Sequence, residues 1–128
     1  MINYLSKVKS SVLFVSVLFF ATNCTTEDPV EGVEKDAVCG VSDPVNNLKW
    51  LNNEFKALIG GPETNGIVLY QYNDNEVIEI QSSVFNSTNI HQYSCDGVKL
   101  NLEDPQAFKD FQSKKKEIKI LFGTKIWQ

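Results

Sequence analysis

The sequence predicts an α+β domain in which an amphipathic N-terminal helix packs on an antiparallel sheet of about four to five strands, with a short second helix before the last strand. Apolar residues recur at three- and four-residue spacing from Val45 to Ile59, which is typical of a helix with one buried face. From Gly66 onward apolar residues alternate with polar ones, which is typical of strands. Short turn sequences separate these runs, as in β-hairpins.

Residues 1–23 are predicted to be a signal peptide. Two lysines precede an apolar run from Val12 to Ala21, which is shorter than the roughly 20 residues of a membrane-spanning helix. The run leads to Cys24, and Ala21-Thr22-Asn23-Cys24 resembles the lipobox of bacterial lipoproteins. In that motif the cysteine is acylated and becomes the mature N-terminus. The resemblance implies a lipoprotein that is anchored in the membrane through lipid on Cys24.

Residues 24–37 are expected to form an acidic flexible tether. They contain Pro29 and Gly32, several acidic residues and no periodic apolar face. Glu27 and Asp28 closely follow the anchor cysteine and resemble the surface-export signal of lipoproteins in Bacteroidetes-type bacteria. That resemblance implies a protein of the outer membrane that is exposed at the cell surface. A solvated linker without a sorting role is the alternative, and it leaves the periplasmic face open.

Residues 38–128 form the single predicted domain. Removal of the signal peptide takes away two lysines and no acidic residue, so the formal charge of -4 becomes more negative. The chain has no arginine. Nucleic-acid binders present a basic face, and carboxylate or phosphate ligands are usually held by arginine. We therefore expect no nucleic-acid partner, and anionic ligands are disfavoured.

The cysteines predict one disulfide. If Cys24 carries lipid, Cys39 and Cys95 remain, and export places both in an oxidising compartment. The alternative is a reactive thiol, because Cys39 lies just before a predicted helix start and His91 is close to Cys95 in the sequence.

The first helix is predicted to begin at Asp43-Pro44 and to end before Gly60-Gly61-Pro62. Asp43 is expected to cap the free N–H groups, and Pro44 suits the first helical position because it lacks an N–H. The buried face consists of Val45, Leu48, Leu51, Phe55, Leu58 and Ile59. Trp50 lies at the margin of this face, which leaves open whether its indole packs in the core or rims a binding surface.

Two hairpins follow. Gly66–Tyr72 and Glu76–Ser82 flank Asn73-Asp74-Asn75, whose residues tolerate a left-handed backbone. The segments Ile90–Cys95 and Val98–Leu102 flank the tight-turn pair Asp96-Gly97. The alternation predicts that the helices cover one face of the sheet and that the other face is at least partly wet.

The last part of the domain is predicted to be a short helix and a long strand. Asp104-Pro105 repeats the helix-start pair of the first helix. Lys114 to Lys116 follow at the carboxyl end, where they suit the helix dipole or form a basic patch. Residues 117–127 predict a strand at the centre of the sheet, because both of its faces carry apolar residues. We expect the segment around Trp127 to be tied down.

The residue types favour a protein that is not an enzyme. His91 is the only histidine, and it lies in a short alternating segment rather than in a recognisable nucleophile and base arrangement. One histidine and two paired cysteines do not supply a zinc site, and no calcium-loop motif occurs. Gly60-Gly61 follows a helix, whereas a phosphate-binding loop precedes one. We expect no catalytic residue, no metal and no cofactor.

Several motifs occur in a fixed order over residues 38–102. Cys39 to Leu51 follows the pattern CG-x-x-DP-x-x-x-L-x-WL, and it precedes the strand Val68–Tyr72 and the segment Tyr93-Ser94-Cys95-Asp96-Gly97. This order resembles a family of small uncharacterised lipoproteins of Bacteroidetes-type bacteria. The resemblance implies architecture and compartment, and it brings no activity.

The function expected from the sequence is a non-catalytic binding or interaction module at the cell envelope. Its partner would be a protein or a glycan, bound by the uncovered sheet face and its aromatic residues. The candidate binding surface is Trp50, Tyr70, Tyr72 and Tyr93. The alternative is an inhibitor or immunity-like protein that acts on an exported enzyme through the loop Ser82–Asn89.

Overall fold

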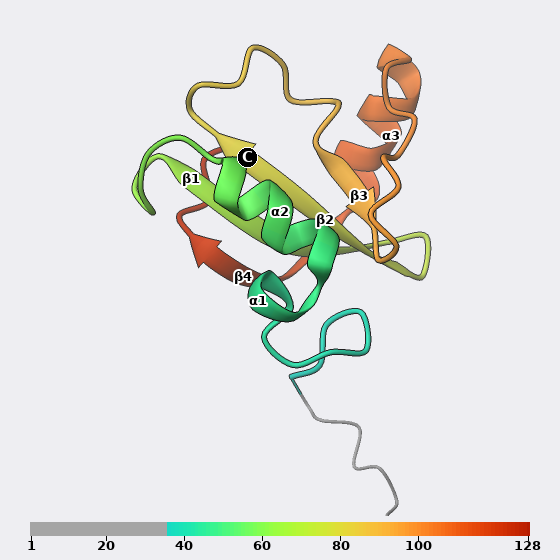
Figure 1. The fold of residues 1–128 in the computed structure, drawn as a ribbon. Coiled ribbons are helices and arrows are strands. Elements are labelled where there is room, and N and C mark those ends of the chain that lie inside the picture. Colours follow the sequence, from blue (N-terminus) through green and yellow to red (C-terminus); the bar gives the residue numbers. More distant parts are fainter. Residues whose placement is uncertain (1–35) are drawn as a thin grey trace, which may run out of the picture. The chain divides into compact units, whose positions relative to one another are not determined.

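The computed structural model describes residues 36–128, and these residues form an α+β fold (Figure 1). Four strands make one antiparallel sheet in the order β3-β2-β1-β4. The elements are α1 (Pro44–Asn47), α2 (Lys49–Ala57), β1 (Asn65–Tyr72), β2 (Asn75–Ser82), β3 (Gln92–Ser94), α3 (Pro105–Lys114) and β4 (Lys116–Gly123). The predicted α+β class and antiparallel sheet are confirmed. The predicted signal peptide, Cys24 and most of the tether lie outside the described residues.

The predicted first helix is two short helices, so its continuity was predicted wrongly. Leu48 lies between α1 and α2 with extended backbone angles, φ -85° and ψ 110°. α2 ends at Ala57, and the Asn65 side-chain amide donates to the Ile59 carbonyl at 3.0 Å. Ile59 is 74% exposed and does not belong to a buried face. Within the described part of the chain, no helix is both long and apolar enough to cross a bilayer.

The two Asp-Pro pairs behave differently. At α3, Asp104 Oδ1 accepts hydrogen bonds from the backbone N–H groups of Gln106 at 2.8 Å and Ala107 at 3.0 Å, which confirms the predicted start. At α1, Asp43 has a left-handed backbone with φ 46° and makes no side-chain cap. Its carboxylate instead accepts from Asn46 Nδ2 at 2.7 Å. The predicted capping role of Asp43 is therefore wrong.

This difference predicts unequal effects of removing the two carboxylates. Asp104→Ala should lower the free energy of unfolding by about 1 kcal/mol, because two N–H groups of α3 lose their acceptor. Asp43→Ala should have a smaller effect, because no backbone N–H of α1 depends on that side chain. Urea denaturation of the two variants measures both changes, and equal losses would contradict the assignment of the caps.

The turn of the first hairpin is two residues long. Tyr72 pairs with Asn75, which leaves Asn73 and Asp74 as the connection. Both residues have positive φ, 48° and 63°, as the type I′ turn requires. The predicted hairpin is confirmed, with Asn75 as the first residue of β2 instead of the last residue of the turn.

Each face of the sheet has its own hydrophobic core. The first core is Val38, Val45, Leu51, Ile67, Leu69, Ile78, Ile80 and Tyr93. The second is Val77, Leu102 and Phe111. Successive side chains of a strand point to opposite faces, so Val77 and Ile78 of β2 assign the two cores to opposite sides. Leu51 of α2 belongs to the first core and Phe111 of α3 to the second, and Figure 1 shows α2 in front of the strands.

The expectation that both helices lie on one face, with the other face wet, is therefore wrong. β1 and β2 are buried along most of their length on both faces. The polar residues of the alternating pattern include Glu79 and Gln81, which are buried beneath α3 and the segment after β4. The polarity of these two residues predicted exposure to solvent. In the structure their polar atoms instead make hydrogen bonds to other side chains and to the backbone in the interior.

β4 is an edge strand, so its predicted central place is wrong. It pairs with β1 on one side, and the strand order places it at the end of the sheet. Two register shifts occur against β1, and Ile118 and Ile120 are 53% and 42% exposed. At the opposite edge, β3 is only three residues long, and the predicted partner strand 98–102 reduces to a single bridge between Tyr93 and Lys99.

Candidate functional site

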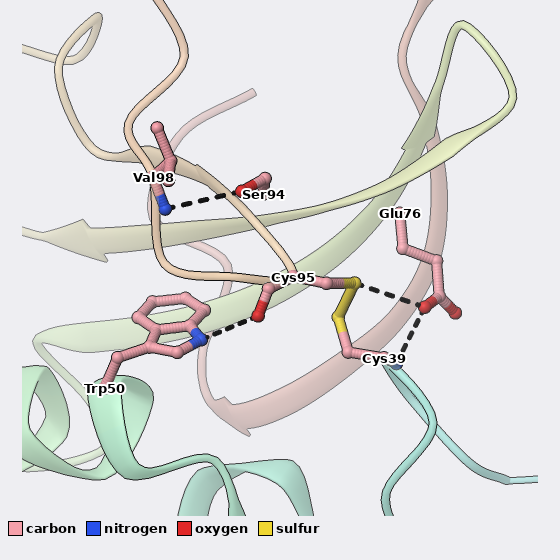
Figure 2. The surroundings of a disulfide bond; sticks show 6 residues. All are labelled: Cys39, Trp50, Glu76, Ser94, Cys95 and Val98. Carbon is pink, nitrogen blue, oxygen red and sulfur yellow. Dashed lines mark hydrogen bonds between the residues drawn. A yellow bond between two sulfur atoms is a disulfide. The ribbon is translucent and has the colours of Figure 1, made fainter.

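The predicted disulfide is confirmed. Cys39 and Cys95 are bonded, with their Cα atoms 5.3 Å apart. The bridge joins the segment before α1 to the end of β3 (Figure 2). Glu76 lies beside it: Oε2 accepts from the Cys39 N–H at 2.7 Å and lies 3.6 Å from Cys95 Sγ. Both sulfur atoms are used in the bridge, so neither cysteine is the reactive thiol of the alternative interpretation.

Trp50 supports the loop that carries Cys95. Its Nε1–H donates to the Cys95 carbonyl at 2.8 Å, and its ring centroid lies 5.2 Å from that of Tyr93 (Figure 2 shows the hydrogen bond). Gly97 makes this approach possible, because a Cβ atom there would lie 2.6 Å from the indole Cγ. The alternative left open by the sequence is resolved: Trp50 packs against Tyr93 of the first core.

The structure does not bring the four predicted aromatic residues together on one surface. Tyr70 and Tyr93 are 1% and 5% exposed, and they point to opposite faces of the sheet. Tyr72 is half-buried, with its hydroxyl donating to Asp110 Oδ2 at 2.7 Å. The predicted binding surface is therefore wrong, because Tyr70 and Tyr93 are buried on opposite faces of the sheet.

Buried polar side chains form a network on the face that carries the second core. Glu79, Gln81 and Gln92 are 0% exposed. Glu79 accepts from Gln81 Nε2 at 2.6 Å through Oε1 and from Gln92 Nε2 at 2.7 Å through Oε2. Lys115 Nζ lies 3.5 Å from Glu79 Oε1, and its side chain is 6% exposed. We call these four residues the Glu79 network. It surrounds a buried carboxylate with two amide donors and a cation.

Burial favours the uncharged forms of Lys115, within the network, and of Tyr70 beside it. Burial lowers the pKa of Lys115, whereas Glu79 acts in the opposite direction. Burial, together with the negative charges of Glu79 and Glu117, raises the pKa of Tyr70. The buried Tyr70 hydroxyl has no hydrogen-bond partner among the described residues. Lys115 Nζ lies 4.4 Å from the Tyr70 ring centroid, so the ring face contacts the cation.

Tyr70→Phe should leave the free energy of unfolding at neutral pH unchanged or raise it, because it removes a buried hydroxyl without a partner. It should also reduce the loss of stability in alkali. A tyrosine whose pKa is raised in the fold stabilises the protein fully below its unfolded pKa of 10.0 and loses that contribution as pH rises through the folded pKa. Lys115, with a lowered pKa, changes in the opposite direction.

Urea denaturation of wild type and Tyr70→Phe between pH 8 and pH 11 measures the difference. Tyr72 and Tyr93 also have raised pKa values, so the variant should retain part of the alkaline loss. Identical pH profiles for the two proteins would show that Tyr70 does not titrate differently in the folded and unfolded states.

A group of partly exposed aromatic side chains lies between the loop after β2 and the segment after β4. The His91 and Phe85 rings are stacked, with centroids 3.9 Å apart and planes 9° apart. The Trp127 ring centroid lies 5.9 Å from His91 and 6.2 Å from Phe85. Burial is the main cause that lowers the pKa of His91, followed by the charge of Lys99. We call Phe85, His91 and Trp127 the aromatic surface.

Sequence reasoning missed the aromatic surface. The predicted last strand extended to Trp127, whereas β4 ends at Gly123. The prediction that the segment around Trp127 is tied down is confirmed, because the N–H groups of Ile126 and Trp127 donate to Gln81 Oε1 at 2.6 and 2.9 Å. Phe85 and His91 lie in the irregular loop between β2 and β3, and Trp127 is far from both in the sequence. Periodicity therefore contained no signal that joins them.

The other sites offer less chemistry. Among residues 36–128, the group of three side chains closest to a metal-ligand arrangement is Cys39, Glu76 and Cys95. Its sulfur atoms are bonded to each other, so they are not thiolate ligands. A cleft of about 420 Å³ beside β4 is lined by Asp36, Val38, Ser42, Asp43, Pro44, Val45, Lys119 and Leu121. This lining contains no histidine or cysteine.

Comparisons of the chain with protein-family models, curated proteins and solved structures find no match.

Proposed function

We propose that the protein is a lipoprotein anchored through Cys24 in the bacterial outer membrane and that it acts as a non-catalytic binding module at the cell envelope. The short apolar run, the lipobox-like residues before Cys24 and the acidic segment after it support the anchor and the compartment. The intact mass of the protein purified from membranes tests this part. A mass that matches an unprocessed chain without lipid would contradict it.

The aromatic surface supports the binding role. Phe85 packs against the first core, whereas Trp127 belongs to neither core. Both Phe85 and Trp127 are only partly buried, as is His91. Partly exposed aromatic rings supply large contact areas with few rotatable bonds, which is why they are enriched at binding sites. This surface replaces the sheet face that the sequence suggested.

Affinity capture from solubilised envelopes tests the binding role. The wild-type chain should retain a protein or glycan, and Trp127→Ala should retain much less. Ile118→Ala, which changes an exposed apolar residue of β4, is the matched control and should retain the wild-type amount. Failure of the wild-type chain to retain any partner would contradict the proposed function.

One observation favours the second candidate, an inhibitor or immunity-like protein. The loop between β2 and β3 extends beyond the sheet, and Val84 on it is 57% exposed (Figure 1 shows the loop). A projecting loop with an apolar side chain suits insertion into the site of an exported enzyme. Inhibition of an enzyme captured from the envelope, abolished by Val84→Lys, would favour this candidate over the first.

A further inference from the structure

Trp127 has a fixed backbone and a side chain outside both cores. Gln81 Oε1 accepts from the N–H groups of Ile126 and Trp127, and Gln81 itself is fully buried. The indole side chain belongs to neither hydrophobic core, so this attachment does not serve to bury it in a core. The arrangement instead holds the indole beside His91, with ring centroids 5.9 Å apart.

The same network holds the other side of the aromatic surface. Gln92 Nε2 donates to the Thr88 carbonyl at 2.6 Å, in the loop between Phe85 and His91. Gln81 and Gln92 are bonded to the two carboxylate oxygens of Glu79. One buried carboxylate therefore positions the two segments that carry the aromatic surface. Such support from beneath fixes a binding site before the ligand arrives, which reduces the entropy lost on binding.

The chain segment that carries Phe85 and His91 is polar and uncharged. From Ile80 to Cys95 the chain contains no Asp, Glu, Lys or Arg. The nearest lysine along the chain to Trp127 is Lys125, and its Nζ is bonded to Glu117 Oε2 at 2.6 Å. Lys99, whose charge lowers the pKa of His91, has its Nζ 5.9 Å from the Tyr93 ring centroid. The segment that carries Phe85 and His91 therefore offers a ligand ring faces and hydrogen-bonding groups but no charged side chain.

The loop also supplies neutral hydrogen-bonding groups. Asn86 is exposed, and Ser87 and Thr88 are partly exposed. Within residues 36–128, no side-chain hydrogen bond engages these three amide and hydroxyl groups. They are both donors and acceptors, which is what a ligand rich in hydroxyl groups requires.

We propose that the aromatic surface is a binding site for a neutral glycan, with the apolar face of a sugar ring on Trp127 and His91 and the sugar hydroxyls on the loop 86–88. This inference rests on the proposed binding function and assigns its ligand class. Sugar rings present C–H groups on one face and hydroxyls at the edge, so an aromatic ring beside neutral amides and hydroxyls matches both parts.

Titration of the full chain, labelled with ¹⁵N and held in detergent micelles, tests this inference. The probes are maltohexaose, laminarihexaose, xylohexaose and mannohexaose, with hexagalacturonate as the charged comparison. The chain has two tryptophans, so their indole N–H signals report separately. The Trp127 signal should shift with a neutral oligosaccharide. The Trp50 signal should stay, because its N–H is bonded to the Cys95 carbonyl.

Variants connect the shift to the site. Trp127→Ala should weaken binding roughly 10- to 100-fold, as expected when an aromatic contact is removed. His91→Ala should weaken it less but measurably, and it is the second variant if Trp127→Ala folds poorly. Ile118→Ala should bind as the wild type does.

The outcomes separate this inference from the proposed function. Absence of a Trp127 shift with all four neutral probes overturns the glycan inference, and so does equal binding of hexagalacturonate. If envelope capture still yields a protein that depends on Trp127, the binding function stands while the ligand class is wrong. If capture yields no partner and no probe binds, both proposals fail.

Discussion

Replacing Cys39 and Cys95 together by serine should lower the free energy of unfolding by about 4 kcal/mol. The bridge spans 56 residues, and closing a loop of this size restricts the unfolded chain by about that amount in the chain-entropy model. The loss is comparable to the total stability of a small domain. Urea denaturation of the oxidised wild type and of the double variant measures it.

Reduced wild type is the matched control for the disulfide. It should unfold near the double variant, because both lack the cross-link while the wild type retains its sulfur atoms. Before reduction, the denatured protein should show no thiol reaction at Cys39 or Cys95. Equal urea midpoints for the oxidised wild type and the double variant would contradict a stabilising role of the bridge.

Lys115→Met should destabilise the protein by about 3–5 kcal/mol, because it leaves the buried Glu79 carboxylate without its cation. Glu79→Gln should also be costly, since it leaves Lys115 in the interior without a carboxylate. The double variant Glu79→Gln/Lys115→Met should lose less than the two single losses together, because no unpaired charge remains. Urea denaturation of the three variants provides the double-mutant cycle.

Lys114→Met is the control for this cycle. Lys114 is the next residue along the chain, and its pair with Asp110 is largely exposed, so its loss should change stability little. If the losses of Glu79→Gln and Lys115→Met simply add in the double variant, the two side chains do not interact as the structure indicates.

Local sequence signals predicted the features that depend on neighbouring residues. The pair Asn73-Asp74 fits a turn with positive φ, and the turn forms there. Asp104 precedes Pro105 and caps α3. Cysteine counting paired Cys39 with Cys95, because an exported chain with two remaining cysteines has a single possible internal bridge.

Features that depend on tertiary packing could not be predicted in the same way. A polar residue in an alternating strand predicts exposure to solvent, and Glu79 follows that pattern. Glu79 is nevertheless buried, where it pairs with Lys115, the residue that directly follows α3. The apolar residues on both faces of the last strand suggested a central position, whereas Ile118 and Ile120 are exposed at an edge. Only the assembled fold shows which partner reaches each side chain.

Likewise, no spacing rule joins His91 with Trp127. Their proximity depends on Gln81, whose buried amide oxygen fixes the segment after β4. The candidate site therefore emerged from backbone hydrogen bonds to a side chain, which sequence periodicity does not record.

The bridge between Cys39 and Cys95 also determines how the domain responds to mechanical force. Force applied to the chain before Cys39 passes through the disulfide to Cys95. The segment between the two cysteines, which are 56 residues apart in the sequence, therefore bears no covalent load. With the bridge intact, the segment between the cysteines cannot be pulled out, so the end-to-end length of the chain does not gain the roughly 190 Å of its fully extended backbone. When force acts between the chain before Cys39 and Trp127, β1, β2 and β3 therefore lie outside the covalent load path, and the load falls on α3, β4 and the segments around them.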